Sequence, residues 1–80
     1  LTRAIMADDK NADAKALLGM AYSQKGLHPQ AKRALQTAVE MVPENADFRC
    51  NHGVVLERAG EFPAAAAAYQ AALHINPHHE

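Results

Sequence analysis

Five histidines and one cysteine are the residues of this 80-residue chain that most readily bind a metal or act in catalysis. His74 and His78 have the i, i+4 spacing that would let two imidazoles share a metal on a continuous helix. Pro77 lies between them and is expected to end the helix first. We therefore expect solvated histidines in a turn, with no metal and no cofactor.

The remaining candidates do not form a catalytic arrangement either. Cys50 and His52 are two residues apart, so on a helix their side chains point about 200° apart and cannot act as a nucleophile and its base. We expect Cys50 to be a small apolar lining residue and His52 to be part-buried and hydrogen-bonded. The sequence contains no Gly-rich phosphate loop, Ser/His/Asp set or paired-carboxylate pocket. We therefore predict no catalytic residues and no enzyme activity in this chain.

Composition excludes several classes of protein. Hydrophobic residues make up 49% and charged residues 21%, as in a folded globular chain, and the net charge of -1 offers no basic field for nucleic acid. Prolines interrupt the Ala-rich C-terminal segment, so no membrane span is predicted. One unpaired cysteine and no visible signal peptide favour a reducing compartment such as the cytoplasm. The chain opens with Leu1, and we expect it to be part of a longer protein.

An internal repeat organises the chain. Displaced by 34 positions, residues 12–45 align with residues 46–79 without a gap. The matched pairs include Gly19/Gly53, Gly26/Gly60, Pro29/Pro63, Ala31/Ala65, Ala38/Ala72 and Pro43/Pro77. The predicted organisation is a repeat at 12–45, a repeat at 46–79, and at 1–11 the end of a preceding repeat's second helix with its linker.

Each repeat is predicted to form two helices. The first helices are expected over about 12–25 and 46–59, with Asn11 and Asn45 as N-caps. Gly26 and Gly60 should end them, because glycine takes the left-handed C-cap conformation without strain.

Prolines bound the second helix of each repeat. Pro29 and Pro63 fall in the first turn, where a missing N–H costs nothing, and Pro43 and Pro77 stop these helices near 42 and 75. Gly19 and Gly53 are expected where the two helices of a hairpin touch. The predicted core comprises Leu17, Leu18, Tyr22, Leu35, Val39, Val42, Val54, Val55, Leu56, Phe62, Tyr69, Leu73 and Ile75.

The period and its signature residues resemble the tetratricopeptide repeat. The matching positions are Leu18-Gly19, Tyr22, Ala31, Leu35 and Pro43, and in the second repeat His52-Gly53, Leu56, Ala65, Tyr69 and Pro77, while Lys15 and Arg49 replace the leading tryptophan. This resemblance implies an all-α fold, an α-solenoid of antiparallel helix-turn-helix hairpins. It also implies a protein–protein interaction scaffold that binds a partner's peptide or helix.

In that family the first helix of each repeat lines a concave groove. The residues expected there are Asp13, Ala16, Met20, Ser23, Gln24, Asp47, Cys50, Asn51, Val54, Glu57 and Arg58. The lysine and asparagines with which some members grip carboxylates are replaced at all but Asn51. Met20 and Val54, flanked by acidic residues, instead favour an amphipathic helix or extended segment with basic residues.

Two alternatives remain at this stage. The chain could be a self-associating structural repeat that forms homo-oligomers through exposed terminal helices, because residues 62–75 carry an apolar strip. It could also be a repeat arm attached to an enzyme whose catalytic residues lie outside this sequence.

Overall fold

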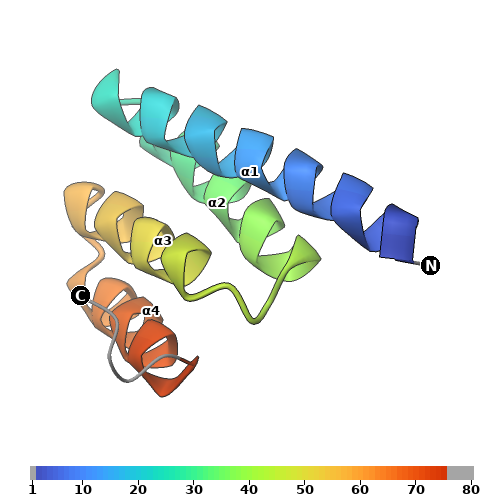
Figure 1. Ribbon diagram of the computed structural model, residues 1–80. Helices are drawn as coiled ribbons and strands as arrows, with labels where there is room; N and C mark the ends of the chain where they lie inside the picture. Colours follow the sequence, from blue (N-terminus) through green and yellow to red (C-terminus); the bar gives the residue numbers. More distant parts are fainter. Residues whose placement is uncertain (1, 76–80) are drawn as a thin grey trace.

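The computed structural model describes residues 2–75, with side chains from residue 11 onward, and this part of the chain is all-α (Figure 1). Its four helices are α1 (Thr2–Gln24), α2 (His28–Met41), α3 (Ala46–Arg58) and α4 (Phe62–Ile75). Residues 2–75 contain no strand. The predicted all-α fold class is therefore confirmed.

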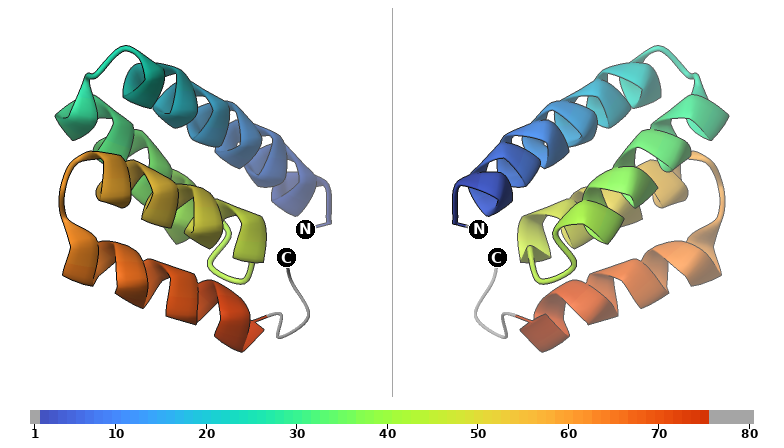
Figure 2. Two further views of the ribbon diagram at one scale, coloured as in Figure 1. Left: turned by 90° about the vertical axis from the view of Figure 1, so that its left-hand side faces the viewer. Right: turned by 90° about the vertical axis from the view of Figure 1, so that its right-hand side faces the viewer.

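The helices form two antiparallel hairpins that stack side by side. α1 packs on α2 and α3 packs on α4, while α2 and α1 both contact α3. α1 and α3 run in the same direction on one side of the molecule (Figures 1 and 2). α2 and α4 make no contact with each other, so the hairpins are joined mainly through α2 and α3.

One glycine turns the chain inside each hairpin, as predicted. Gly26 and Gly60 have φ values of 80° and 84°, which a residue with a Cβ adopts only with strain. The chain closes each turn with equivalent hydrogen bonds, from Leu27 N to Tyr22 O and from Glu61 N to Leu56 O, both 2.9 Å. These bonds satisfy carbonyl groups that the helix end would otherwise leave unpaired.

The second hairpin also begins as predicted. The N–H of Phe48 donates to Asn45 Oδ1 at 3.1 Å, which confirms Asn45 as the N-cap of α3. Pro29 lies in the first turn of α2, and α2 ends at Met41, two residues before Pro43. Pro77 and His78 lie outside the described residues.

The prediction that Asn11 caps the start of the first helix is wrong. Residues 2–24 form one continuous helix, so Asn11 lies inside α1 and caps nothing. The physical reason lies two residues earlier: Asp9 occupies the position that Pro43 holds in the next repeat, and unlike proline it keeps its N–H and permits helical geometry. The division into repeats at 1–11, 12–45 and 46–79 stays a prediction.

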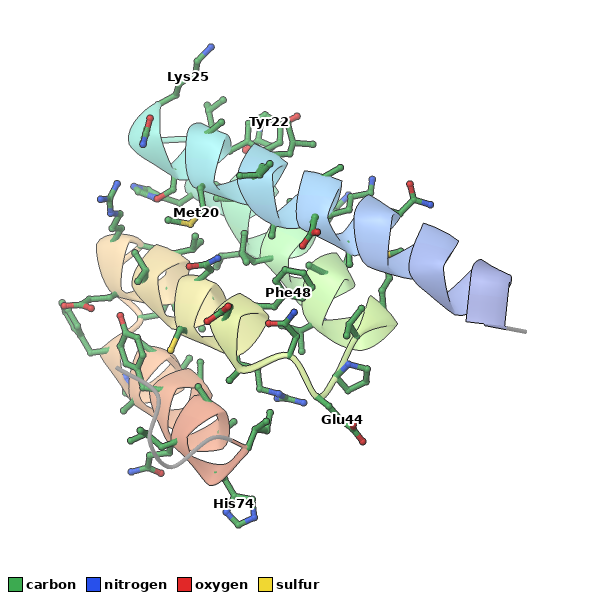
Figure 3. All side chains as sticks on the ribbon, in the orientation of Figure 1. Met20, Tyr22, Lys25, Glu44, Phe48 and His74 are labelled. Atoms are coloured by element: carbon green, nitrogen blue, oxygen red, sulfur yellow. The ribbon has the colours of Figure 1, made fainter. Side chains whose placement is uncertain are left out.

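Small residues build most of the core, which lies between α1, α2 and α3. Its buried members are Ala12, Ala16, Ala31, Leu35, Ala38, Phe48 and Val55. A Cβ at Gly19 would overlap with Leu35 Cδ2 and lie 3.1 Å from Ala31 O, which confirms that α1 and α2 touch at this glycine. Phe48, absent from the predicted core, points from α3 toward α1 and α2 (Figure 3).

Several large residues predicted to be buried are exposed instead. These are Leu17, Leu18, Phe62, Leu73 and Ile75. No element of the described chain covers the faces on which they lie. Leu35, Val55 and Leu56 are buried as expected.

Candidate functional site

The surface between the two parallel helices α1 and α3 is the candidate binding site. Positions 13, 17, 20 and 24 of α1 and 47, 51, 54 and 58 of α3 share the same helical spacing and the 34-residue offset. We call this set the α1–α3 groove: Asp13, Leu17, Met20, Gln24, Asp47, Asn51, Val54 and Arg58. A depression of about 340 Å³ at one end is lined by Asp13, Leu17, Asp47 and Asn51, with Ala16, Asn45 and Phe48 completing its walls.

The middle of the α1–α3 groove is apolar. Leu17 leaves 72% of its surface exposed. Met20 is half-buried against the core and points from α1 toward α3 (Figure 3), and Val54 is half-buried on α3. These three side chains form an apolar strip that water covers in the isolated chain.

The two ends of the groove differ in charge. Asp13 and Asp47 are both exposed and line the same depression, so two carboxylates lie beside Leu17. Because α1 and α3 run in the same direction and end at Gln24 and Arg58, these two residues lie at the opposite end of the groove. The groove is therefore acidic at one end and neutral to basic at the other.

Four residues expected to line the groove are turned toward the core or toward α4, although Ala16 also lies in the wall of the depression. Ala16 and Ser23 are each only 4% exposed, because they are close to Gly19 on the side of α1 that packs against the rest of the molecule. The equivalent residues of α3 face α4: Tyr69 Oη donates to Glu57 Oε1 at 2.9 Å, and the neighbouring Cys50 contributes to a raised pKa of Tyr69. Glu57 is therefore not an acidic edge of the groove.

Leu17 is exposed, whereas the sequence predicts that it is buried in the core. It was predicted to be buried beside Leu18, yet it lies four residues after Asp13 and three before Met20, on the same helical stripe. Its equivalent Asn51 was already placed in the groove, so the 34-residue offset was the signal that identifies it.

Burial and neighbouring charges shift the pKa of two titratable groups near the site. Burial, with a smaller contribution from Asp47, raises the pKa of the Cys50 thiol and keeps it protonated. Burial and the charge of Arg49 lower the pKa of His52, which is half-buried as predicted. Among residues 11–75, no three His, Cys, Asp or Glu side chains come close enough to hold a metal ion.

Comparison with known families decides the identity of this arrangement. A family model described as tetratricopeptide repeat matches residues 16–80, which is most of the chain. The chain belongs to the tetratricopeptide repeat (TPR) family. TPR domains are non-catalytic scaffolds that generally mediate protein–protein interactions. A search of curated proteins gave no match.

The length and hydropathy of the helices show whether any of them could cross a membrane. Within the part of the chain that the structure describes, no helix combines the length and the apolar character that crossing a bilayer requires.

Proposed function

We propose that this TPR chain binds one segment of a partner protein in the α1–α3 groove, and that the segment is amphipathic with basic residues. The observation that supports this most directly is the position of Leu17, an exposed leucine between the carboxylates of Asp13 and Asp47. An exposed apolar side chain beside two carboxylates, continued along the helices by Met20 and Val54, has the layout of a binding surface.

Apolar contacts would supply most of the affinity. Fully burying a leucine contributes about 1.5–3 kcal/mol, and Leu17 still has most of that surface available. Met20 and Val54 are already half-buried and add less. Three such contacts are few, which implies a short segment held with moderate affinity.

The carboxylates would select the partner and its direction. Exposed ion pairs contribute about 0–1 kcal/mol each, so Asp13 and Asp47 discriminate between partners more than they bind them. A segment with lysine or arginine at one end would lie with that end at the two aspartates. Its other end would then lie near Gln24 and Arg58, where an acidic or neutral residue fits better.

We also propose that the chain contributes binding and no catalysis of its own. The raised pKa of the Cys50 thiol, which disfavours the nucleophilic thiolate, supports this view. A reaction in the same protein would then depend on residues outside this sequence.

A peptide titration tests the binding proposal. The probe is a fluorescent 14-residue peptide with leucines at i, i+3, i+4 and i+7 and two lysines at one end, compared with a peptide carrying glutamates in place of the lysines. We expect the lysine peptide to bind at least about tenfold more tightly, since attraction to Asp13 and Asp47 is replaced by repulsion. Added salt should reduce that difference.

Two variants locate the site. Leu17→Glu should weaken binding of the lysine peptide, and Leu18→Glu, the matched control one residue along on another face of α1, should leave it unchanged. Equal binding of both peptides, or equal loss in both variants, would reject the α1–α3 groove as the site.

A further inference from the structure

A second groove, on a different face, has a structural counterpart inside the molecule. We call the depression between α1 and α2 the terminal groove, and it is lined by Lys15, Leu18, Tyr22, Pro29, Gln30, Arg33, Ala34 and Thr37. The internal groove, between α3 and α4, is lined by Arg49, His52, Leu56, Ala64, Ala67, Ala68 and Ala71, together with Lys32, Gln36 and Glu61. Every residue that lines the terminal groove, except Pro29, has its equivalent 34 positions later in the lining of the internal groove. The two grooves are the same surface of successive repeats.

The internal groove is closed on one side by another helix. α2 packs on α3 beside it and contributes Lys32 and Gln36 to its wall. Leu56 is buried there, whereas its equivalent Tyr22 in the terminal groove is only half-buried. The fold therefore shows which kind of element this surface accepts, namely the second helix of a repeat.

α4 is the other helix of that kind in the chain. α2 spans residues 28–41 and α4 spans 62–75, so the two have the same length and the same register in the repeat. Val39 of α2 is half-buried, but its equivalent Leu73 on α4 is 50% exposed, because no element of the described chain lies against that side of α4. The molecule thus carries an uncovered groove at one end and an uncovered matching helix at the other.

We propose that α4 of one copy packs along the terminal groove of a second copy, in the geometry that α2 adopts against α3. Ala66 and Gln70 then take the places of Lys32 and Gln36. The chain associates head to tail, through two different surfaces. Such contacts add further copies instead of stopping at a two-fold dimer.

Two contacts can be compared: the internal joint, where α2 packs on α3, and the proposed joint between copies, where α4 packs on the terminal groove. The residues that differ between these joints favour the contact between copies. The internal joint contains an ion pair between Lys32 and Glu61, and the equivalent positions 66 and 27 hold the exposed residues Ala66 and Leu27. His52 of the internal groove is replaced by Leu18, which is 43% exposed. A joint between copies is therefore more apolar than the one inside the chain, and burying it is favourable.

Sedimentation velocity on the full 80-residue chain tests the proposal. From about 10 µM to about 1 mM, a range that covers weak interfaces, we expect the average mass to rise past that of a dimer. Leu18→Glu blocks the groove and Leu73→Glu blocks α4, so each variant alone should associate at least about tenfold more weakly, because a carboxylate would be buried unpaired. Both sites are exposed, and circular dichroism should show unchanged helicity.

Mixing the two variants gives the decisive result. A Leu73→Glu chain still has an open groove and a Leu18→Glu chain still has an intact α4, so the mixture should form a 1:1 heterodimer and nothing larger. The matched control Leu17→Glu should associate like the unaltered chain, although it loses peptide binding. A wild-type chain that stays monomeric, a wild-type dimer that never grows, or a mixture that stays monomeric would each overturn the proposal.

Discussion

Replacing Gly19 by alanine should destabilise the protein, although alanine is the better helix former. The substitution gains about 1 kcal/mol in helix propensity. Against this, the new methyl group would overlap with Leu35 Cδ2 and lie 3.1 Å from Ala31 O and 3.3 Å from Ala34 Cβ. Leu35 is fully buried, so any shift of its side chain disturbs the core around it, and overpacking at the upper end of about 1–3 kcal/mol applies. The net loss in the free energy of unfolding should be about 1–2 kcal/mol.

Gly53→Ala is the matched control at the equivalent position of α3. There the new methyl group would meet the ring of Tyr69 at 2.8 Å, but Tyr69 is only half-buried and its hydroxyl is bonded at the surface. The ring can swing outward, so the gain in propensity and the loss in contact should nearly cancel.

Urea unfolding followed by circular dichroism, at a protein concentration low enough to suppress association, measures both changes. A thermal melt should show Gly19→Ala lowered by about 4–8 °C for each kcal/mol lost. Equal effects at the two glycines, or a stabilised Gly19→Ala, would refute the argument that contact with a buried side chain outweighs propensity.

Three further predictions follow from single contacts. Asn45→Ala removes the cap on the Phe48 N–H and should lower the free energy of unfolding by about 1 kcal/mol in urea titrations. Because the folded state lowers the pKa of His52 below 6.5, the unfolded state binds its proton first, and stability should fall as the pH drops below that value. An NMR titration of His52 should have a midpoint under 6.5, and His52→Gln should remove this part of the pH dependence. The raised pKa of the Cys50 thiol predicts slow alkylation by iodoacetamide near pH 8, faster in Asp47→Asn; a rate equal to that of a free cysteine peptide would count against it.

The sequence predicted the hairpins well because their ends depend on local backbone chemistry. Gly26 and Gly60 turn the chain through left-handed conformations, and Asn45 caps α3 through a bond three residues away. Such signals act within a few residues and are readable without the fold. The same local chemistry explains why α1 continues through Asn11. Asp9, at the position equivalent to Pro43, keeps its N–H and does not end a helix as proline does.

Burial was harder to predict, because it depends on which faces find a neighbour. Leu18 and Leu73 have the residue types of a core, and only the arrangement of the hairpins shows that nothing in the described chain covers them. In the candidate groove, the helical period did not show that Ala16 and Ser23 would be buried. Their placement depends on the direction in which Gly19 packs, which is a tertiary contact.

The lack of contact between α2 and α4 has a mechanical consequence. The two hairpins are hinged along the α2–α3 seam, and the outer side of this hinge is bridged by the ion pair between Lys32 and Glu61. The core shared by α1, α2 and α3 holds the inner side of the seam, whereas the partly exposed ion pair adds about 0–1 kcal/mol on the outer side. The angle between the hairpins, and with it the spacing of α1 and α3, is therefore set by the core far more than by this pair of charges.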